Sequence, residues 1–161
     1  MKYIKTYEKL RLGNQKDLNN ALLKYCRVKE SLQLIRSLLY KGADINCKDL
    51  QGLTPLLIAS NSRFYSAVKL LIEKGADVNA TDSYGNNAII FLTITEKIGN
   101  KIRECVDLLI EKDIDLTQSN KNTRRDVFSI GGKLITNYIK EKYPEKYEEY
   151  LLKKDAEKYN L

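Results

Sequence analysis

The chain has 161 residues, 43% of them hydrophobic and 30% charged, a composition typical of one folded, soluble domain with a shared core. It contains no histidine, which excludes His-dependent catalytic triads and the commonest zinc ligand, and its net charge of +7 lies mainly at the two ends. No apolar run approaches the roughly 20 residues that a membrane-spanning helix needs.

Residues 1–14 carry basic side chains with no apolar stretch behind them, so we expect no secretory signal there and predict an N-terminal cap or extension. The cysteines Cys26, Cys47 and Cys105 are odd in number and lack metal-ligand spacing, so they imply no disulfide framework. A reducing cytoplasm is therefore the expected location.

Residues 15–48 are predicted to form the first of several helix pairs. The stretch ALLKYCR occupies the place of a first helix. The stretch SLQLIRSLLYKGADIN then sets Ile35 and Leu38 at helical spacing. Gly42 follows, and a glycine just after a helix can take the left-handed conformation that closes the last turn.

The clearest unit covers residues 49–81. Thr54 can cap a helix N-terminus, and Pro55 fits the first helical turn, where its missing N–H costs nothing. The stretch AVKLLIEKGADVN predicts a second helix that ends at the same Gly-Ala-Asp phrase as in the first unit. Asp77 and Asn79 then supply short polar side chains that can hydrogen-bond the turn backbone.

Two further units, at residues 82–119 and 120–143, repeat the helix–helix pattern with weaker motifs. The sequence Asn-Ala-Ile-Ile at residues 87–90 replaces Thr-Pro-Leu-Leu, and Asp113 stands where the second unit has glycine. Five extra residues, at 96–100, should lengthen the loop between two helices, although such a loop could also touch a partner. In the last unit, SIGGKLIT lacks the spacing of a phosphate-binding loop, so we predict a helix–helix turn there.

The C-terminal segment, residues 144–161, is predicted to be one helix that starts at Pro144 and Glu145. From the residue just before this segment onward, apolar side chains recur at helical spacing: Tyr143, Tyr147, Tyr150 and Leu151. We predict that this helix caps the last unit, the alternative being a helix that binds a partner.

The second unit closely resembles an ankyrin repeat, whose pattern combines a D-x-x-G turn, T-P-L-H-x-A and a G-A-D-V-N tail. The matching residues are Asp49, Gly52, Thr54, Pro55, Leu56, Ala59, Leu70, Leu71, Gly75, Ala76, Asp77 and Asn79. Leu57 stands where the family usually has a histidine that ties neighbouring turns together, so apolar contact would have to replace that bonding. The resemblance, which weakens away from the second unit, covers residues 15–143. It implies an all-α solenoid of about four stacked helix-turn-helix units with short hairpin turns.

The resemblance also implies a non-enzymatic protein, without cofactor or metal, that binds another protein through its turn tips and concave face. Stacking uses the periodic apolar residues and leaves the tips exposed. The predicted partner-binding residues are Lys48, Leu50, Gln51, Leu53, Thr81, Ser83, Tyr84, Asn86, Lys121, Asn122 and Arg124. Leu50, Leu53 and Tyr84 are candidate anchors because apolar side chains at exposed turns favour interfaces. Leu53 could instead tuck under its own helix.

Two other classes of function have less support. A nucleic-acid-associated protein would explain the basic ends, but no helix-turn-helix, finger or RNA-binding motif is present. An enzyme could use the acids Glu104, Asp107, Glu111, Asp113 and Asp115, although the first three have the spacing of a solvated helix face. Lysine outnumbers arginine 21 to 7, a bias shared by small ankyrin proteins of intracellular bacteria and large DNA viruses. This similarity suggests an adaptor or inhibitor that acts on host proteins, in an oligomeric state left open.

Overall fold

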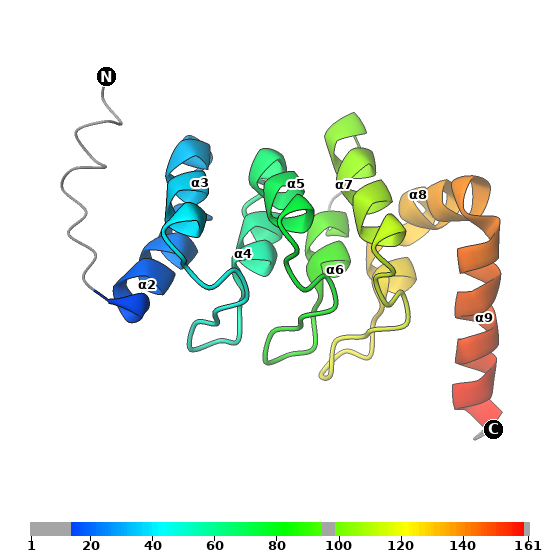
Figure 1. Cartoon of the computed structure of the whole chain (residues 1–161). Coiled ribbons are helices and arrows are strands. Elements are labelled where there is room, and N and C mark those ends of the chain that lie inside the picture. Colours follow the sequence, from blue (N-terminus) through cyan, green and yellow to red (C-terminus); the bar gives the residue numbers. More distant parts are fainter. Residues whose placement is uncertain (1–13, 95–98, 160–161) are drawn as a thin grey trace.

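Figure 1 shows the computed structural model, which describes residues 14–94 and 99–159. Within these ranges the chain forms helices and no strands, and the predicted all-α solenoid is confirmed. The helices are α2 (Gln15–Tyr25), α3 (Leu32–Tyr40), α4 (Pro55–Asn61), α5 (Tyr65–Glu73), α6 (Ala88–Thr93), α7 (Asn100–Glu111), α8 (Val127–Lys142) and α9 (Pro144–Tyr159).

The helices stack side by side as pairs along one direction (Figure 1). One layer contains α2, α4 and α6, and the other contains α3, α5 and α7. Packing joins the two helices of each pair, and it also joins each helix to the equivalent helix of the next pair, as between α4 and α6 or α5 and α7. This arrangement lets short helices share one core, since no single pair can bury both of its faces.

Local capping explains where the helices of the first layer begin. The Thr54 hydroxyl accepts a hydrogen bond from the Leu57 N–H at 3.3 Å, and Pro55 occupies the first turn, as predicted. Asn87 performs the same role at α6, where its side-chain oxygen accepts the Ile90 N–H at 3.2 Å. Asparagine therefore replaces threonine without loss of the cap.

The helices of the second layer end in a left-handed residue. Gly75 has φ of 86° after α5, and the Ala76 N–H then bonds the Leu71 carbonyl at 2.9 Å. Asp113 takes φ of 55° after α7, although it is not glycine. Aspartate tolerates this conformation better than most residues because its short side chain can hydrogen-bond locally. The weakened third motif thus keeps the geometry of the second.

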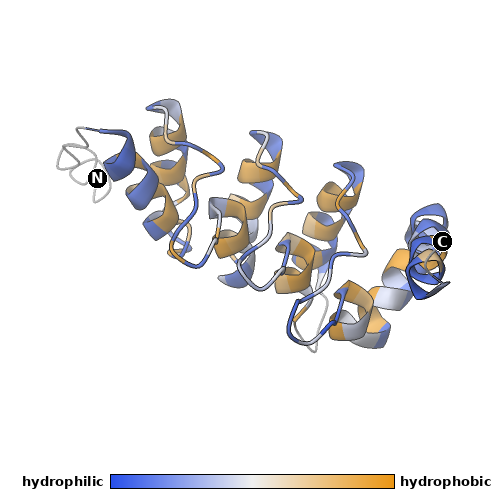
Figure 2. Cartoon of the chain, turned by 90° about the horizontal axis from the view of Figure 1, so that it is seen from below, coloured by the Kyte–Doolittle hydropathy of each residue, from blue (hydrophilic) through white to orange (hydrophobic). Residues whose placement is uncertain are grey.

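One continuous apolar core runs through the stack. In Figure 2 most of the stacked helices are largely hydrophobic, whereas α9, at the C-terminal end, is largely hydrophilic. The fully buried members of the core include Leu22, Ile35, Leu57, Leu71, Ile89 and Leu109. Leu57, at the position where the family usually has histidine, is completely buried. Apolar packing accordingly replaces the polar tie at this position.

A ladder of asparagine side chains runs along the stack, a feature that the sequence did not predict. The side-chain oxygens of Asn46 and Asn79 each accept a backbone N–H from the next unit, and that of Asn19, in α2, accepts one from the turn after α3 of its own unit. The three bonds run from Asp44 N–H to Asn19 Oδ1 (2.9 Å), from Asp77 N–H to Asn46 Oδ1 (2.9 Å) and from Asp115 N–H to Asn79 Oδ1 (2.7 Å). Asn79 also donates to the Asp113 carbonyl at 3.2 Å. These bonds fix the distance between segments that lie more than twenty residues apart in sequence.

The last unit departs from the others within α8. Gly132 has φ of 60° and ψ of −162°, so the helix breaks there into two parts, as the predicted helix–helix turn requires. Residues 96–98 of the predicted insertion lie outside the described residues. Its last two residues, Gly99 and Asn100, are the N-cap and the first residue of α7.

The C-terminal helix α9 packs on α8 as expected of a cap. The Phe128 ring lies 5.4 Å from the Tyr147 ring and 4.2 Å from the Tyr150 ring, measured between centroids. The Tyr150 hydroxyl also donates to the Asp126 carboxylate at 3.0 Å. The predicted apolar stripe is covered only in part, because Leu151 is 37% exposed. Aromatic rings, the Tyr150 hydroxyl and ion pairs from Lys146 and Lys154, rather than aliphatic burial, hold this helix.

A second carboxylate ties α7 to the end of α8. Asp107 accepts hydrogen bonds from the Tyr138 hydroxyl at 2.6 Å, the Tyr143 hydroxyl at 2.9 Å and the Lys142 ammonium at 2.5 Å. Burial by itself would raise the pKa of Asp107, but the bonds from Lys142 and the two tyrosines outweigh it and lower the pKa. Burial and the bond to Asp107 raise the pKa of Tyr143 to about 12.

Candidate functional site

Three hairpin loops project from the same side of the stack (Figure 1). In the first loop the Asp49 N–H bonds the Leu53 carbonyl at 3.1 Å, and in the second the Asp82 N–H bonds the Asn86 carbonyl at 3.1 Å. The third loop closes from residue 120 to residue 125, at 3.0 Å. It is therefore one residue longer than the other two.

Each loop folds around a side chain that points inward. The Asp49 carboxylate accepts the backbone N–H groups of Gln51 at 2.9 Å and Leu53 at 3.0 Å. Asp82 does the same in the second loop, at 2.9 and 2.8 Å. In the third, the side-chain oxygen of Asn120 accepts two backbone N–H groups, at 3.0 and 2.9 Å. The same local chemistry thus builds three loops from different residues.

The loop tips are also bonded to one another. Both the N–H and the hydroxyl of Ser83 donate to the Gln51 carbonyl, at 3.0 and 2.8 Å. The Lys121 N–H donates to the Tyr84 carbonyl at 2.7 Å. Residues 48–51, 83–84 and 121–125 therefore form one continuous surface, which we call the tip ridge.

Most of the predicted partner-binding residues are exposed on the tip ridge: Lys48, Leu50, Gln51, Ser83, Tyr84, Lys121, Asn122 and Arg124. Leu50 is fully exposed, and Tyr84 is 54% exposed. Thr81 and Asn86 are half-buried beside it, and the Asn86 amide bonds Asp82 at 2.9 Å. The bonds of Asn86 thus help to shape the second loop.

Leu53 is a correction to the sequence-based prediction. Only 9% of this residue is exposed, and it belongs to the hydrophobic core. The Asp49 carboxylate holds its N–H within the turn, and the side chain then lies in the core with the helices. The alternative, that Leu53 tucks beneath its own helix, describes the structure better than the anchor role.

Arg125 also belongs to the ridge, although it is not among the predicted partner-binding residues. Its carbonyl closes the third loop by accepting the Asn120 N–H, and the residue is exposed. The signal available in the sequence was the pair Arg124-Arg125 inside a turn that is one residue too long for the D-x-x-G pattern. The extra residue is accommodated because Arg124 takes φ of 53°.

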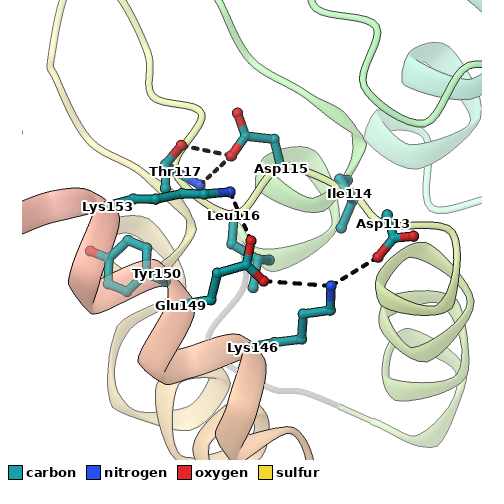
Figure 3. A pocket seen from close by; sticks show the side chains of 9 residues that line it. All are labelled: Asp113, Ile114, Asp115, Leu116, Thr117, Lys146, Glu149, Tyr150 and Lys153. Carbon is teal, nitrogen blue, oxygen red and sulfur yellow. Dashed lines mark hydrogen bonds and ion pairs between the residues drawn. The ribbon is translucent and has the colours of Figure 1, made fainter. Parts of the chain in front are cut away.

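A separate cleft of about 290 Å³ lies between α9 and residues 113–117 (Figure 3). The Lys146 ammonium lies 2.8 Å from the Asp113 carboxylate and 3.6 Å from the Glu149 carboxylate. Lys153 pairs with the other oxygen of Glu149 at 2.9 Å. These charges neutralise one another across the cleft, which therefore resembles a helix-docking seam more than a ligand site.

The acidic residues that an enzyme would use do not converge. Glu104 pairs with Lys69, Asp113 pairs with Lys146, and Asp107 accepts its bonds from the end of α8. The bond from Lys146 lowers the pKa of Asp113, and no group of three metal-binding side chains occurs among the described residues. Burial raises the pKa of Cys26 to about 12, so this thiol stays protonated and a poor nucleophile.

Comparison with known proteins identifies the repeated unit. A family model described as ankyrin repeats, in three copies, matches residues 15–120. That span contains α2 to α7, and α8 and α9 lie beyond it. No curated protein matches the chain. Among the described residues, none of the helices has the length and apolar character needed to cross a membrane.

Proposed function

This chain belongs to the ankyrin repeat family, and on that premise we propose that it is a non-enzymatic module that binds another protein through the tip ridge. Ankyrin repeats generally serve as protein-interaction modules, and the apolar side chains needed for stacking are already used inside this molecule. What is left for a partner is the surface that stacking does not cover.

The observation that carries the proposal is the exposure of two large apolar side chains, Leu50 and Tyr84, on a bonded scaffold. Isolated exposed apolar residues are ordinary on protein surfaces. These two lie on successive tips that backbone hydrogen bonds join at Gln51 and Ser83. Burial of such side chains at the centre of an interface supplies much of the binding energy. Because the ridge is already ordered, binding it should cost little conformational entropy.

We further propose that the module acts in a reducing cytoplasm as an adaptor or inhibitor, rather than as an enzyme. The three cysteines are free and buried, which supports such a compartment. The lysine-rich composition, similar to that of small ankyrin proteins from intracellular bacteria and large DNA viruses, supports host proteins as targets.

A matched pair of variants tests this function. The Leu50→Ala/Tyr84→Ala double variant should lose at least about 90% of the protein that the wild type captures from a cell lysate, because two anchors are removed. The control double variant, Leu152→Ala/Tyr40→Ala, removes one leucine and one tyrosine that are 71% and 93% exposed away from the ridge. It should capture normally.

Quantitative mass spectrometry of the captured proteins gives the readout, and the helical circular dichroism of both variants should match the wild type. Capture that survives the loss of Leu50 and Tyr84 would refute the tip ridge as the binding surface. Equal loss in both variants would show non-specific apolar adhesion, and it would refute the proposal as well.

A further inference from the structure

We propose that the partner of the tip ridge is a protein that presents an acidic surface to it; this inference rests on the proposed function and specifies its partner. The ridge combines exposed apolar groups with exposed charge, and all of the outward charge has one sign. The argument depends on which way the charged side chains of the three loops face.

The acidic side chains of the loops face inward. Asp82 is only 7% exposed, and its carboxylate is occupied by the N–H groups of Tyr84 and Asn86. Asp49 accepts two backbone N–H groups and also pairs with Arg27 at 3.1 Å. Both carboxylates are thus used to fold the loops, and Asp49 in addition neutralises Arg27, so neither is paired with a cation of the ridge.

The basic side chains of the loops face outward. They are Lys48, Lys121, Arg124 and Arg125, all exposed. None of the four forms an ion pair within the part of the chain that the structure describes. On α9 the situation is the reverse, because Lys146, Lys153 and Lys154 pair with carboxylates. These three lysines of α9 are thus neutralised within the molecule, whereas the four cations of the ridge are not.

The two apolar side chains of the ridge, Leu50 and Tyr84, lie between Lys48 on the first loop and the three cations of the third loop. On the first tip, Lys48 lies two residues from Leu50. Between the second and third tips, the Lys121 N–H is bonded to the Tyr84 carbonyl. The longer third loop then adds two arginines. A complementary partner would place carboxylates opposite the four cations and apolar recesses around Leu50 and Tyr84. Charge of opposite sign speeds encounter and excludes partners that carry the wrong charge.

A nucleic acid could also contact four cations, but Leu50 favours a protein. Affinity for phosphates needs charge, and bases stack on aromatic or guanidinium planes. A fully exposed leucine at the tip does neither, whereas aliphatic side chains fit apolar recesses in protein partners. The test therefore compares the two classes directly.

The probe is a fluorescein-labelled random copolymer of glutamate and tyrosine, and duplex DNA of similar charge is the competing probe. One variant carries Lys48→Gln, Lys121→Gln, Arg124→Gln and Arg125→Gln. The control variant loses the same charge at four exposed positions away from the ridge: Lys29→Gln, Arg36→Gln, Lys101→Gln and Lys133→Gln. Fluorescence anisotropy at low and at physiological salt measures binding, and circular dichroism checks folding.

The ridge variant should bind the copolymer at least about tenfold more weakly than the wild type, since four ion pairs at an exposed surface are lost. The control variant should change by less than about threefold. Equal weakening of both variants would mean that binding follows net charge alone and would overturn the inference. Tighter ridge-dependent binding of duplex DNA, or no copolymer binding at low salt, would also overturn it.

Lysate capture separates failure of this inference from failure of the proposed function. If the Leu50→Ala/Tyr84→Ala variant loses its captured protein and the four-glutamine ridge variant keeps it, the ridge binds a partner that is not acidic. That result would support the proposed function and refute the inference that the partner is acidic. If both variants keep the protein, the proposed function itself falls.

Discussion

The stacking of the loop tips makes a sharp prediction at Gly85. This residue has φ of 83°, and a Cβ added to it would lie 2.8 Å from the Ser119 carbonyl oxygen, a backbone atom of the next loop. Gly75 provides a matched control. It has nearly the same φ, 86°, but a Cβ there would meet nothing within 4 Å. Comparison of the two alanine variants separates the contact between loops from the backbone conformation.

The magnitudes follow from these two environments. Gly75→Ala should cost about 1–2 kcal/mol in the free energy of unfolding, the cost of placing a side chain in the left-handed region. Gly85→Ala carries the same cost and also forces the third loop to move. That movement strains the 2.7 Å bond from Lys121 N–H to the Tyr84 carbonyl, and overpacking of this kind costs about 1–3 kcal/mol more. The expected total for Gly85→Ala is therefore about 2–5 kcal/mol.

Urea unfolding followed by circular dichroism at a helical wavelength measures both variants, with the midpoint and slope reported for each. Because neither substitution adds a polar group, a difference between the two variants reports the steric contact at Ser119. A Gly85→Ala variant that loses no more stability than Gly75→Ala would refute the description of the tips as a bonded ridge.

The remaining predictions concern the links between units. Asn79→Ala should lower the free energy of unfolding by about 1–2 kcal/mol in urea unfolding, and Asn46→Ala by about 0.5–1 kcal/mol. The larger loss is expected at Asn79 because its side chain forms two hydrogen bonds to the next unit, whereas that of Asn46 forms one. Equal losses would contradict the ladder. The lowered pKa of Asp107 means that its contribution to stability is present above its ordinary value of 3.8 and is lost as pH falls through the lower folded-state value. The free energy of unfolding of the wild type should therefore fall more between pH 6 and pH 3 than that of the Asp107→Asn variant. Parallel profiles of stability against pH would contradict the role of Asp107 in tying α7 to the end of α8.

The sequence by itself determined the helix pairs and their ends. Thr54 with Pro55, and the glycine after α5, act within a few residues of chain, so their effect is readable locally. The resemblance of the second unit to an ankyrin repeat then fixed the stacking. Even Asp113, which breaks the motif, preserved the turn, because aspartate accepts the same conformation. The exposed tips at Leu50 and Tyr84 were also predictable, since stacking has no use for them.

Only the tertiary structure decided which of these side chains remain available to a partner. Leu53 entered the core, while the adjacent loop residues stayed outside, and no periodicity distinguishes a turn residue that faces in from one that faces out. The bonds from Asn79 to the next unit, and from Ser83 to Gln51, join residues more than thirty positions apart. Their partners depend on how one unit is placed against the next. That placement is set by the packing of many buried side chains at once, so it exists only after the units have stacked.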